Sequence, residues 1–188
     1  MLTIQNEAVT EYEIKKSKFL SFLVPVGQFE KRLADLRAAH PKARHFVTAS
    51  RYINAYDQVV ESFSDDGEPK GVAGMPTLKV LQGNALINVG IITVRYFGGI
   101  KLGTGGMARA YAEAANLAVG EATLEEYIKS YEAVMDIAYS DLSRLEHAVA
   151  GYDDVVIASR EYGSQGIRLL LRGRECSVME IITGFRNE

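Results

Sequence analysis

The sequence predicts an α+β protein made of two small domains. Short β-branched apolar runs alternate with amphipathic segments of helical period along the chain. After residues 120–126, which are typical of a linker, the pattern of elements restarts and the charge turns acidic. We therefore expect a first domain over residues 1–122 and a second over residues 123–188.

The first domain should contain four strands and three helices. In chain order, the expected elements are a strand at 14–26, a helix at 29–39, strands at 44–50 and 58–64, a helix that starts after Gly74-Met75-Pro76, a strand at 89–97 and a helix at 104–119. The first helix places Phe29, Leu33 and Leu36 on one face and stops before Pro41. The second helix carries Pro76 in its first turn, where proline is tolerated. The last strand is almost continuously apolar, which predicts burial on both faces.

The second domain should follow the order β-α-β-β-α. The expected elements are a strand at 127–139, a helix from 142 to 149, strands at 155–162 and 167–171, and a helix at 175–183. Asp141 should cap the first of these helices and Gly151 should close it. Gly163 and Gly166 bound a four-residue hairpin between the last two strands. This order is that of a ferredoxin-like unit without its last strand.

Composition excludes several classes of protein. No apolar run approaches the roughly 20 residues that span a bilayer, and the N-terminus lacks the pattern of a signal peptide. A single cysteine, Cys176, excludes an internal disulfide framework and a multi-cysteine zinc site. We expect a soluble, cytoplasmic protein.

Charge is distributed unevenly between the two parts. Residues 1–120 hold 14 Lys/Arg and 11 Asp/Glu, a net charge of +3, whereas residues 121–188 hold 7 and 13, a net charge of −6. Clustered cations are what a polyanion needs, so the first part is the better candidate surface for one. Such an imbalance is also common on solvated surfaces.

The glycine-rich segment between the buried strand and the following helix is the strongest candidate site. Such a loop aims free N–H groups and the positive end of the helix at one point, where a phosphate or carboxylate can bind. The segment matches neither common nucleotide-binding glycine motif, and its glycines are also explained by tight turns and close helix–sheet packing. The predicted anion- or nucleic-acid-binding residues are Arg95, Gly98, Gly99, Lys101, Gly103, Thr104, Gly105, Gly106 and Arg109.

An acidic turn and a histidine are possible neighbours of that site. Asp65, Asp66 and Glu68 fall within four residues and could hold a hard cation, although the same sequence is typical of an exposed turn. His45 could act as a base, but a histidine in a predicted strand is more often a satisfied, partly buried residue. We assign no catalytic residue, no metal ligand and no cofactor.

Two long motifs identify a family resemblance. The segments SDDGEPKGVAGMPTLKVL and VRYFGGIKLGTGGMARAYAEAA closely resemble the YigZ/IMPACT family, over about residues 15–119. The resemblance implies a first domain folded like the second domain of a small-subunit ribosomal protein. The acidic second domain is similar to the C-terminal domain of the bacterial YigZ branch, which implies a ferredoxin-like fold like the last domain of elongation factor G.

The resemblance also bears on function. Eukaryotic relatives regulate translation by competing for a ribosome-associated activator of a starvation-sensing kinase, so RNA or translation components are the expected partners. Members often carry a cysteine two residues after the histidine that matches His45. This chain has Val47 there, so thiol chemistry at that pair is not expected.

Three functional hypotheses remain open from the sequence. The first is an anion-binding, RNA- or ribosome-associated protein that regulates translation. The second is a metal-assisted hydrolase or phosphoryl-transfer enzyme that uses the acidic turn. The third is a protein–protein regulator whose incomplete second sheet pairs with a partner strand.

Overall fold

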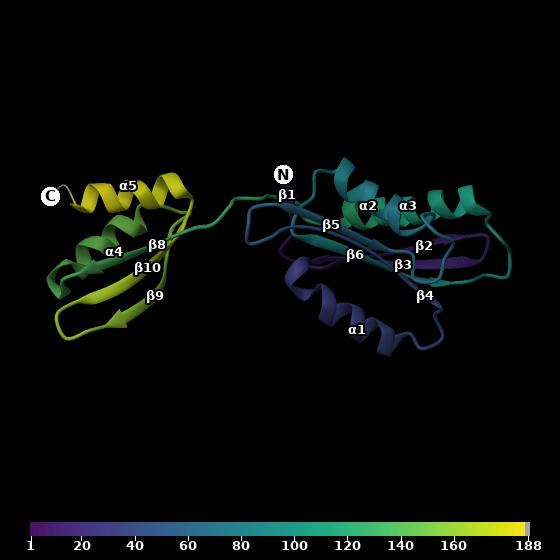
Figure 1. Ribbon diagram of the computed structural model, residues 1–188, viewed down its shortest axis with the longest axis horizontal. Coiled ribbons are helices and arrows are strands. Elements are labelled where there is room, and N and C mark those ends of the chain that lie inside the picture. Colours follow the sequence, from purple (N-terminus) through teal and green to yellow (C-terminus); the bar gives the residue numbers. More distant parts are fainter. Residues whose placement is uncertain (187–188) are drawn as a thin grey trace. The chain divides into compact units, whose positions relative to one another are not determined.

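A computed structural model describes residues 1–186, with the side chain of Arg186 left aside. The chain forms two compact units, Met1–Tyr127 and Ile128–Glu188, shown in Figure 1. Both mix helices and strands, as the predicted α+β class requires. No helix in the described part of the chain is long and apolar enough to cross a membrane.

The first unit is built on a five-stranded antiparallel sheet of order β2-β3-β6-β4-β5. Its strands are β2 (Ala8–Ile14), β3 (Ser17–Pro25), β4 (His45–Ile53), β5 (Val59–Ser64) and β6 (Val89–Tyr96). Its helices are α1 (Phe29–Ala39), α2 (Gly74–Gly83) and α3 (Thr104–Glu121). A short 3-10 helix, η1 (Val26–Gln28), precedes α1. Strands β1 (Leu2–Thr3) and β7 (Glu125–Glu126) pair with each other as a separate two-stranded sheet.

Helices cover both faces of this sheet. Figure 1 shows α2 and α3 on one face and α1 on the other. Phe29 and Leu36 of α1 pack with Ile92 of β6 on one side. On the other side, Leu81 of α2 packs with Ile91 of the same strand. Because both faces of β6 are covered, its residues Val89–Arg95 are all buried, which explains the continuous apolar run in the sequence.

The predicted strand at 14–26 is wrong in its extent. The chain instead forms a hairpin of β2 and β3, which turns through Lys15 and Lys16. Both lysines have positive φ angles, 48° and 63°. Such turns usually use Asn or Gly, so two lysines gave no local signal for a hairpin.

The predicted linker at 120–126 is also corrected. Helix α3 continues to Glu121, and Glu125–Glu126 pair with Leu2–Thr3 as β7. This segment is held to the first unit by pairing with the distant N-terminal strand. The first unit therefore continues to Tyr127, beyond the expected boundary at residue 122.

The second unit is a three-stranded antiparallel sheet of order β8-β10-β9 with two helices. Its elements are β8 (Tyr131–Ile137), η2 (Tyr139–Asp141), α4 (Leu142–Ala150), β9 (Val156–Tyr162), β10 (Ile167–Gly173) and α5 (Glu175–Arg186). Figure 1 shows both helices on one face of the sheet, where Leu145 of α4 and Val178 of α5 pack with Leu169 of β10. Within residues 1–186, no strand follows α5.

Two local expectations in the second unit need correction. Asp141 occupies the N-cap position of α4, but its side chain makes no capping hydrogen bond; its carboxylate instead lies 3.8 Å from Arg144. Strand β8 is also shorter than the predicted 127–139, because pairing with β10 covers only Tyr131–Ile137.

Candidate functional site

Segments far apart in the sequence meet at one end of the first unit's sheet. His45 begins β4 and lies directly opposite Arg95, near the end of β6. The acidic turn follows the end of β5, and the glycine-rich loop follows the end of β6. Strand register, rather than sequence proximity, therefore brings together the histidine, the acidic turn and the glycine-rich loop.

A buried charged network forms the base of this site. Glu68 and Arg95 form an ion pair with side chains only 4% and 5% exposed. The Tyr111 hydroxyl, on α3, donates a hydrogen bond of 2.8 Å to the same Oε1 of Glu68. Burial, together with the negative charge of Glu68, raises the pKa of Tyr111 far above its ordinary value, so Tyr111 remains a proton donor. Three elements are thus tied together by one carboxylate.

This network uses only some of the hydrogen-bond donors of Arg95. Its Nη1 contacts Glu68 and the sulfur of Met107. Its Nε is buried and has no hydrogen-bond partner in the described part of the chain. The guanidinium carbon lies 5.5 Å from the ring centre of Phe19 and 5.7 Å from that of Phe97, which is within range of cation–π attraction.

The ring orientation of His45 follows from its neighbours. Nδ1 lies 2.9 Å from the backbone oxygen of Asp66. Because a carbonyl oxygen only accepts, this contact assigns the proton to Nδ1. The other nitrogen, Nε2, lies 4.0 Å from Oε1 of Glu68.

The first two carboxylates of the acidic turn serve the backbone. Asp65 accepts hydrogen bonds from the amides of Gly71, Ala73 and Gly74, at the start of α2. Burial alone would raise the pKa of Asp65, but these three amides outweigh it and hold that pKa below its ordinary value. Asp66 accepts from the Phe46 amide and from Arg37.

These contacts argue against the cation site that the sequence had left open. It required at least two of Asp65, Asp66 and Glu68 to face a common ion, whereas each is committed to a different protein donor. Among the residues that the structure describes, no group of three or more His, Cys, Asp or Glu side chains could hold a metal ion. The metal-assisted hypothesis therefore has no ligand set in this turn.

The glycine-rich loop leads into an uncapped helix terminus. Gly103, at the N-cap of α3, has a φ of +74°, a region that favours glycine, and no side chain caps the helix. The first hydrogen bond of the helix runs from Met107 N to Gly103 O. In the described part of the chain, the amides of Thr104, Gly105 and Gly106 donate to no protein group. These are the free donors that the sequence predicted.

A cavity of about 390 Å³ opens at this helix terminus. Its lining combines apolar residues with charged or polar ones. The lining residues are Arg44, His45, Glu68, Pro69, Arg95, Phe97, Lys101, Leu102, Gly103, Thr104 and Met107. A second cavity of about 280 Å³ shares four of them and adds Lys42 and Tyr96.

Several cations in or near the two cavities have no ion-pair partner among the described residues. Lys42, Arg44 and Lys101 line them, and the Nη1 of Arg109 lies 3.7 Å from where a Cβ on Gly105 would stand. None of these four side chains forms an ion pair with another described residue. An anion in the larger cavity would therefore meet cations that have no competing partner.

The structure divides the predicted site residues into three groups. His45, Glu68, Arg95, Lys101, Gly103 and Thr104 line the larger cavity. Five others belong to the glycine-rich loop or to α3 but do not line the cavity: Gly98, Gly99, Gly105, Gly106 and Arg109. Asp65 and Asp66 form the third group, because they support the acidic turn. The sequence-based prediction missed Arg44 and Phe97, although Arg44 precedes His45 and Phe97 lies inside the glycine-rich motif.

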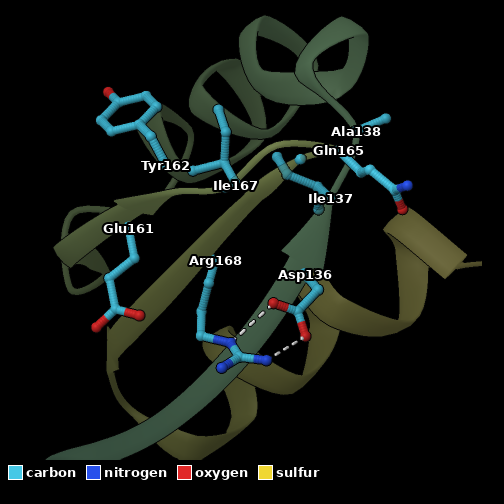
Figure 2. Close-up of a pocket in the computed structure, with 10 residues that line it drawn as sticks. Asp136, Ile137, Ala138, Glu161, Tyr162, Gln165, Ile167 and Arg168 are labelled. Atoms are coloured by element: carbon cyan, nitrogen blue, oxygen red, sulfur yellow. Dashed lines mark hydrogen bonds and ion pairs between the residues drawn. The ribbon is translucent and has the colours of Figure 1, made fainter.

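A cavity of about 530 Å³ in the second unit lacks unpaired positive charge among its lining residues. Figure 2 shows Arg168 of β10 and Asp136 of β8 joined by two hydrogen bonds, of 2.9 and 3.1 Å. The hydrogen bond from Arg168 lowers the pKa of Asp136, as expected for a satisfied ion pair. Since its arginine is already neutralised, this cavity is the weaker candidate for an anion.

Comparisons with known proteins agree with the resemblance seen in the motifs. Residues 15–119 match the model of the Impact N-terminal domain. An IMPACT family member of Haemophilus influenzae is 35% identical over 164 residues, covering 84% of this chain and 78% of that protein. The IMPACT family member YigZ of Escherichia coli is 37% identical over 153 residues, covering 80% and 74%. A crystal structure of a protein described as hypothetical superposes with a TM-score of 0.73 at 30% identity, covering 99% of this chain and 91% of that one.

Proposed function

Because this chain belongs to the IMPACT family, we propose that it binds RNA through the anion site at the start of α3 and thereby regulates translation. The observation that carries the proposal is the uncapped N-terminus of α3, whose free amides open beside a cavity with unpaired cations. Free N–H groups and the positive end of a helix attract phosphate.

The buried Arg95 supports this assignment independently. Its side chain is 5% exposed and lines both cavities, and its Nε lacks a partner in the described residues. A buried donor without a partner is unfavourable, because it no longer forms a hydrogen bond to water. A phosphate oxygen is the kind of acceptor that this part of the site lacks.

RNA is the anion that best fits the distribution of charge. The cations come from three segments, the α1–β4 loop (Lys42, Arg44), the glycine-rich loop (Lys101) and α3 (Arg109). A spread of cations over one surface suits a chain of phosphates better than a single small anion. The regulatory role rests on the family resemblance, whose eukaryotic members act on translation.

Binding at varied salt concentration tests the proposal. The wild-type chain should co-sediment with ribosomal particles and bind a short RNA at low salt, and both should weaken as salt rises. Lys101→Ala and Arg109→Ala should each lower the slope of log affinity against log salt by about 0.7, the value for one phosphate of a single strand. Lys79→Ala, which removes an exposed cation from α2, is the matched control.

Two results would contradict this function. One is the absence of RNA and ribosome binding at low salt. The other is a salt slope that neither Lys101→Ala nor Arg109→Ala changes.

The edge of the second unit's sheet supports a second candidate function, that of a protein–protein regulator. In the sheet order β8-β10-β9, strands β8 and β9 each have one side that pairs with no described strand. An open edge can accept a partner strand. In that case, hydrogen exchange of the β8 or β9 amides should slow when translation components are added, and unchanged exchange in both strands would rule this candidate out.

A further inference from the structure

The exposed ring of Phe97 is not explained by phosphate binding. Phe97 follows β6 directly and is 56% exposed, although β6 itself is buried. It lines both cavities, and the guanidinium of Arg95 lies 5.7 Å from its ring centre. A large exposed aromatic side chain in a cavity lined with cations is typical of a surface that stacks a base.

The apolar lining of the larger cavity is suited to a flat, mainly apolar group. Pro69, Leu102 and Met107 line the larger cavity together with Phe97. Lys101 and Thr104, the latter at the start of α3, line the same cavity. Its volume of about 390 Å³ lies within the range of roughly 300–1,000 Å³ found for small-ligand sites. A base and its neighbouring phosphate could therefore be held at the same time.

Further cations lie beside the loop that carries Phe97. The backbone of Lys16, in the β2–β3 turn, approaches Gly98 so closely that a Cβ there would stand 2.0 Å from the Lys16 carbonyl carbon. Both lysines of this turn are exposed. The loop that carries Phe97 therefore lies close to a turn with two exposed lysines, in addition to Lys101.

We propose that this cavity binds one unpaired nucleotide of an RNA strand, with its base stacked on Phe97 and its phosphate at the amides of Thr104–Gly106. The inference rests on the proposed function and narrows its ligand to single-stranded RNA, loops or ends. In a duplex the bases are stacked within the helix, so only phosphates and sugars could reach the site. Phe97 would then contribute nothing to the binding of a duplex.

Equilibrium binding of two RNA probes tests the inference. The probes are a short single strand and a blunt duplex of the same sequence, used with the full chain. The single strand should bind more tightly, and Phe97→Ala should weaken its binding by about ten-fold, within the range measured for base–aromatic stacking. Phe97→Tyr, which keeps a ring, should restore most of the affinity. Duplex binding should not change with either variant.

The control variant is Tyr56→Ala. Tyr56 is an aromatic residue that is 83% exposed and lies between β4 and β5. His45 begins β4, whereas Tyr56 lies beyond the other end of that strand. Its removal should change the binding of neither probe.

A second measurement does not depend on any variant folding. The chain has no tryptophan, so the emission of 2-aminopurine placed in the single strand can be followed without interference. Stacking on Phe97 should quench this emission when the wild-type protein binds. Binding without quenching would overturn the inference.

The two proposals fail in different ways. If Lys101→Ala weakens the binding of both probes while Phe97→Ala weakens the binding of neither, the anion site stands and the unpaired-nucleotide site is wrong. If neither probe binds at low salt, the proposed function fails and the inference fails with it.

Discussion

His45 Nε2 lies 4.0 Å from Oε1 of Glu68, the same oxygen that contacts Arg95 and Tyr111. One buried carboxylate therefore joins β6 and α3 at the base of the candidate site, with His45 of β4 beside it. The residues that shape the cavity depend on this carboxylate, so its removal should affect both stability and binding.

Glu68→Gln should destabilise the protein strongly. The substitution keeps the size of the side chain but leaves the charge of Arg95 buried without a counterion, and breaking such pairs lowers the free energy of unfolding by about 3–5 kcal/mol. Urea unfolding measures the change. The control is Glu61→Gln, which breaks a more exposed pair with Arg51 and should lower that free energy by only about 0–1 kcal/mol. Equal losses for the two variants would show that the buried network does not stabilise the fold.

Tyr111→Phe should also be destabilising, by a smaller amount. It removes one hydrogen bond to a charged acceptor, which contributes about 1.5–3 kcal/mol. The ring should keep its edge-on contact with Phe19, whose centre lies 5.0 Å away. Tyr152→Phe, which removes an exposed hydroxyl bonded to Glu180, is the control and should change little. Thermal unfolding of both variants would show the difference, and its absence would contradict the role given to Tyr111.

Asp65→Asn should remove a pH-dependent part of the stability. The folded pKa of Asp65 is lowered, so its charge stabilises the native state at pH above its ordinary pKa of about 3.8. That stabilisation disappears as pH falls below 3.8 and through the folded pKa. Hence the variant should be about 1 kcal/mol less stable than wild type at pH 7, and the difference should shrink in acid.

Urea unfolding at several pH values measures this effect. Asp35→Asn, which removes an exposed carboxylate from α1, is the matched control and should change stability by about 0.5 kcal/mol or less. A deficit of Asp65→Asn that stays constant from pH 7 to pH 2 would contradict the role of this carboxylate as the acceptor for the amides of Gly71, Ala73 and Gly74.

Local patterns in the sequence predict much of the fold. Helix α1 and strand β6 lie where periodicity and apolar runs predicted them, because each is determined by residues close in sequence. The β2–β3 hairpin and β7 were missed for different physical reasons. The hairpin turns through two lysines, which carry no turn signal, and β7 exists only because it pairs with the distant β1.

In the candidate site, too, the local features were predicted and the features that depend on distant residues were not. The glycine-rich motif predicted the free amides at the start of α3, since glycine spacing is a local signal. The position of His45 opposite Arg95 depends on the register of β4 and β6, which no short segment encodes. The sequence left open whether the carboxylates hold an ion or form an ordinary turn, because their partners, such as the amides of Gly71 and Gly74, become neighbours only when the turn is folded.

Gly98→Ala should disrupt the loop that carries Phe97 and Lys101. An added Cβ would stand 2.0 Å from the carbonyl carbon of Lys16 and 2.3 Å from the amide nitrogen of Ser17, and backbone atoms cannot move aside as a flexible side chain can. The loop would have to separate from the β2–β3 turn, which would break the hydrogen bond from Gly98 N to Ser17 Oγ. We expect the free energy of unfolding to fall by about 1–3 kcal/mol and RNA binding to weaken.

Gly120→Ala separates this effect from a general effect of glycine replacement. A Cβ at Gly120, near the end of α3, would meet no atom within 4 Å, so alanine there should stabilise the helix by about 0.5–1 kcal/mol and leave RNA binding unchanged. Unfolding and RNA binding measured on both variants give the comparison. If Gly98→Ala proved as stable as wild type and bound RNA equally well, close packing of the loop against Lys16 could not be what holds Phe97 and Lys101 in place.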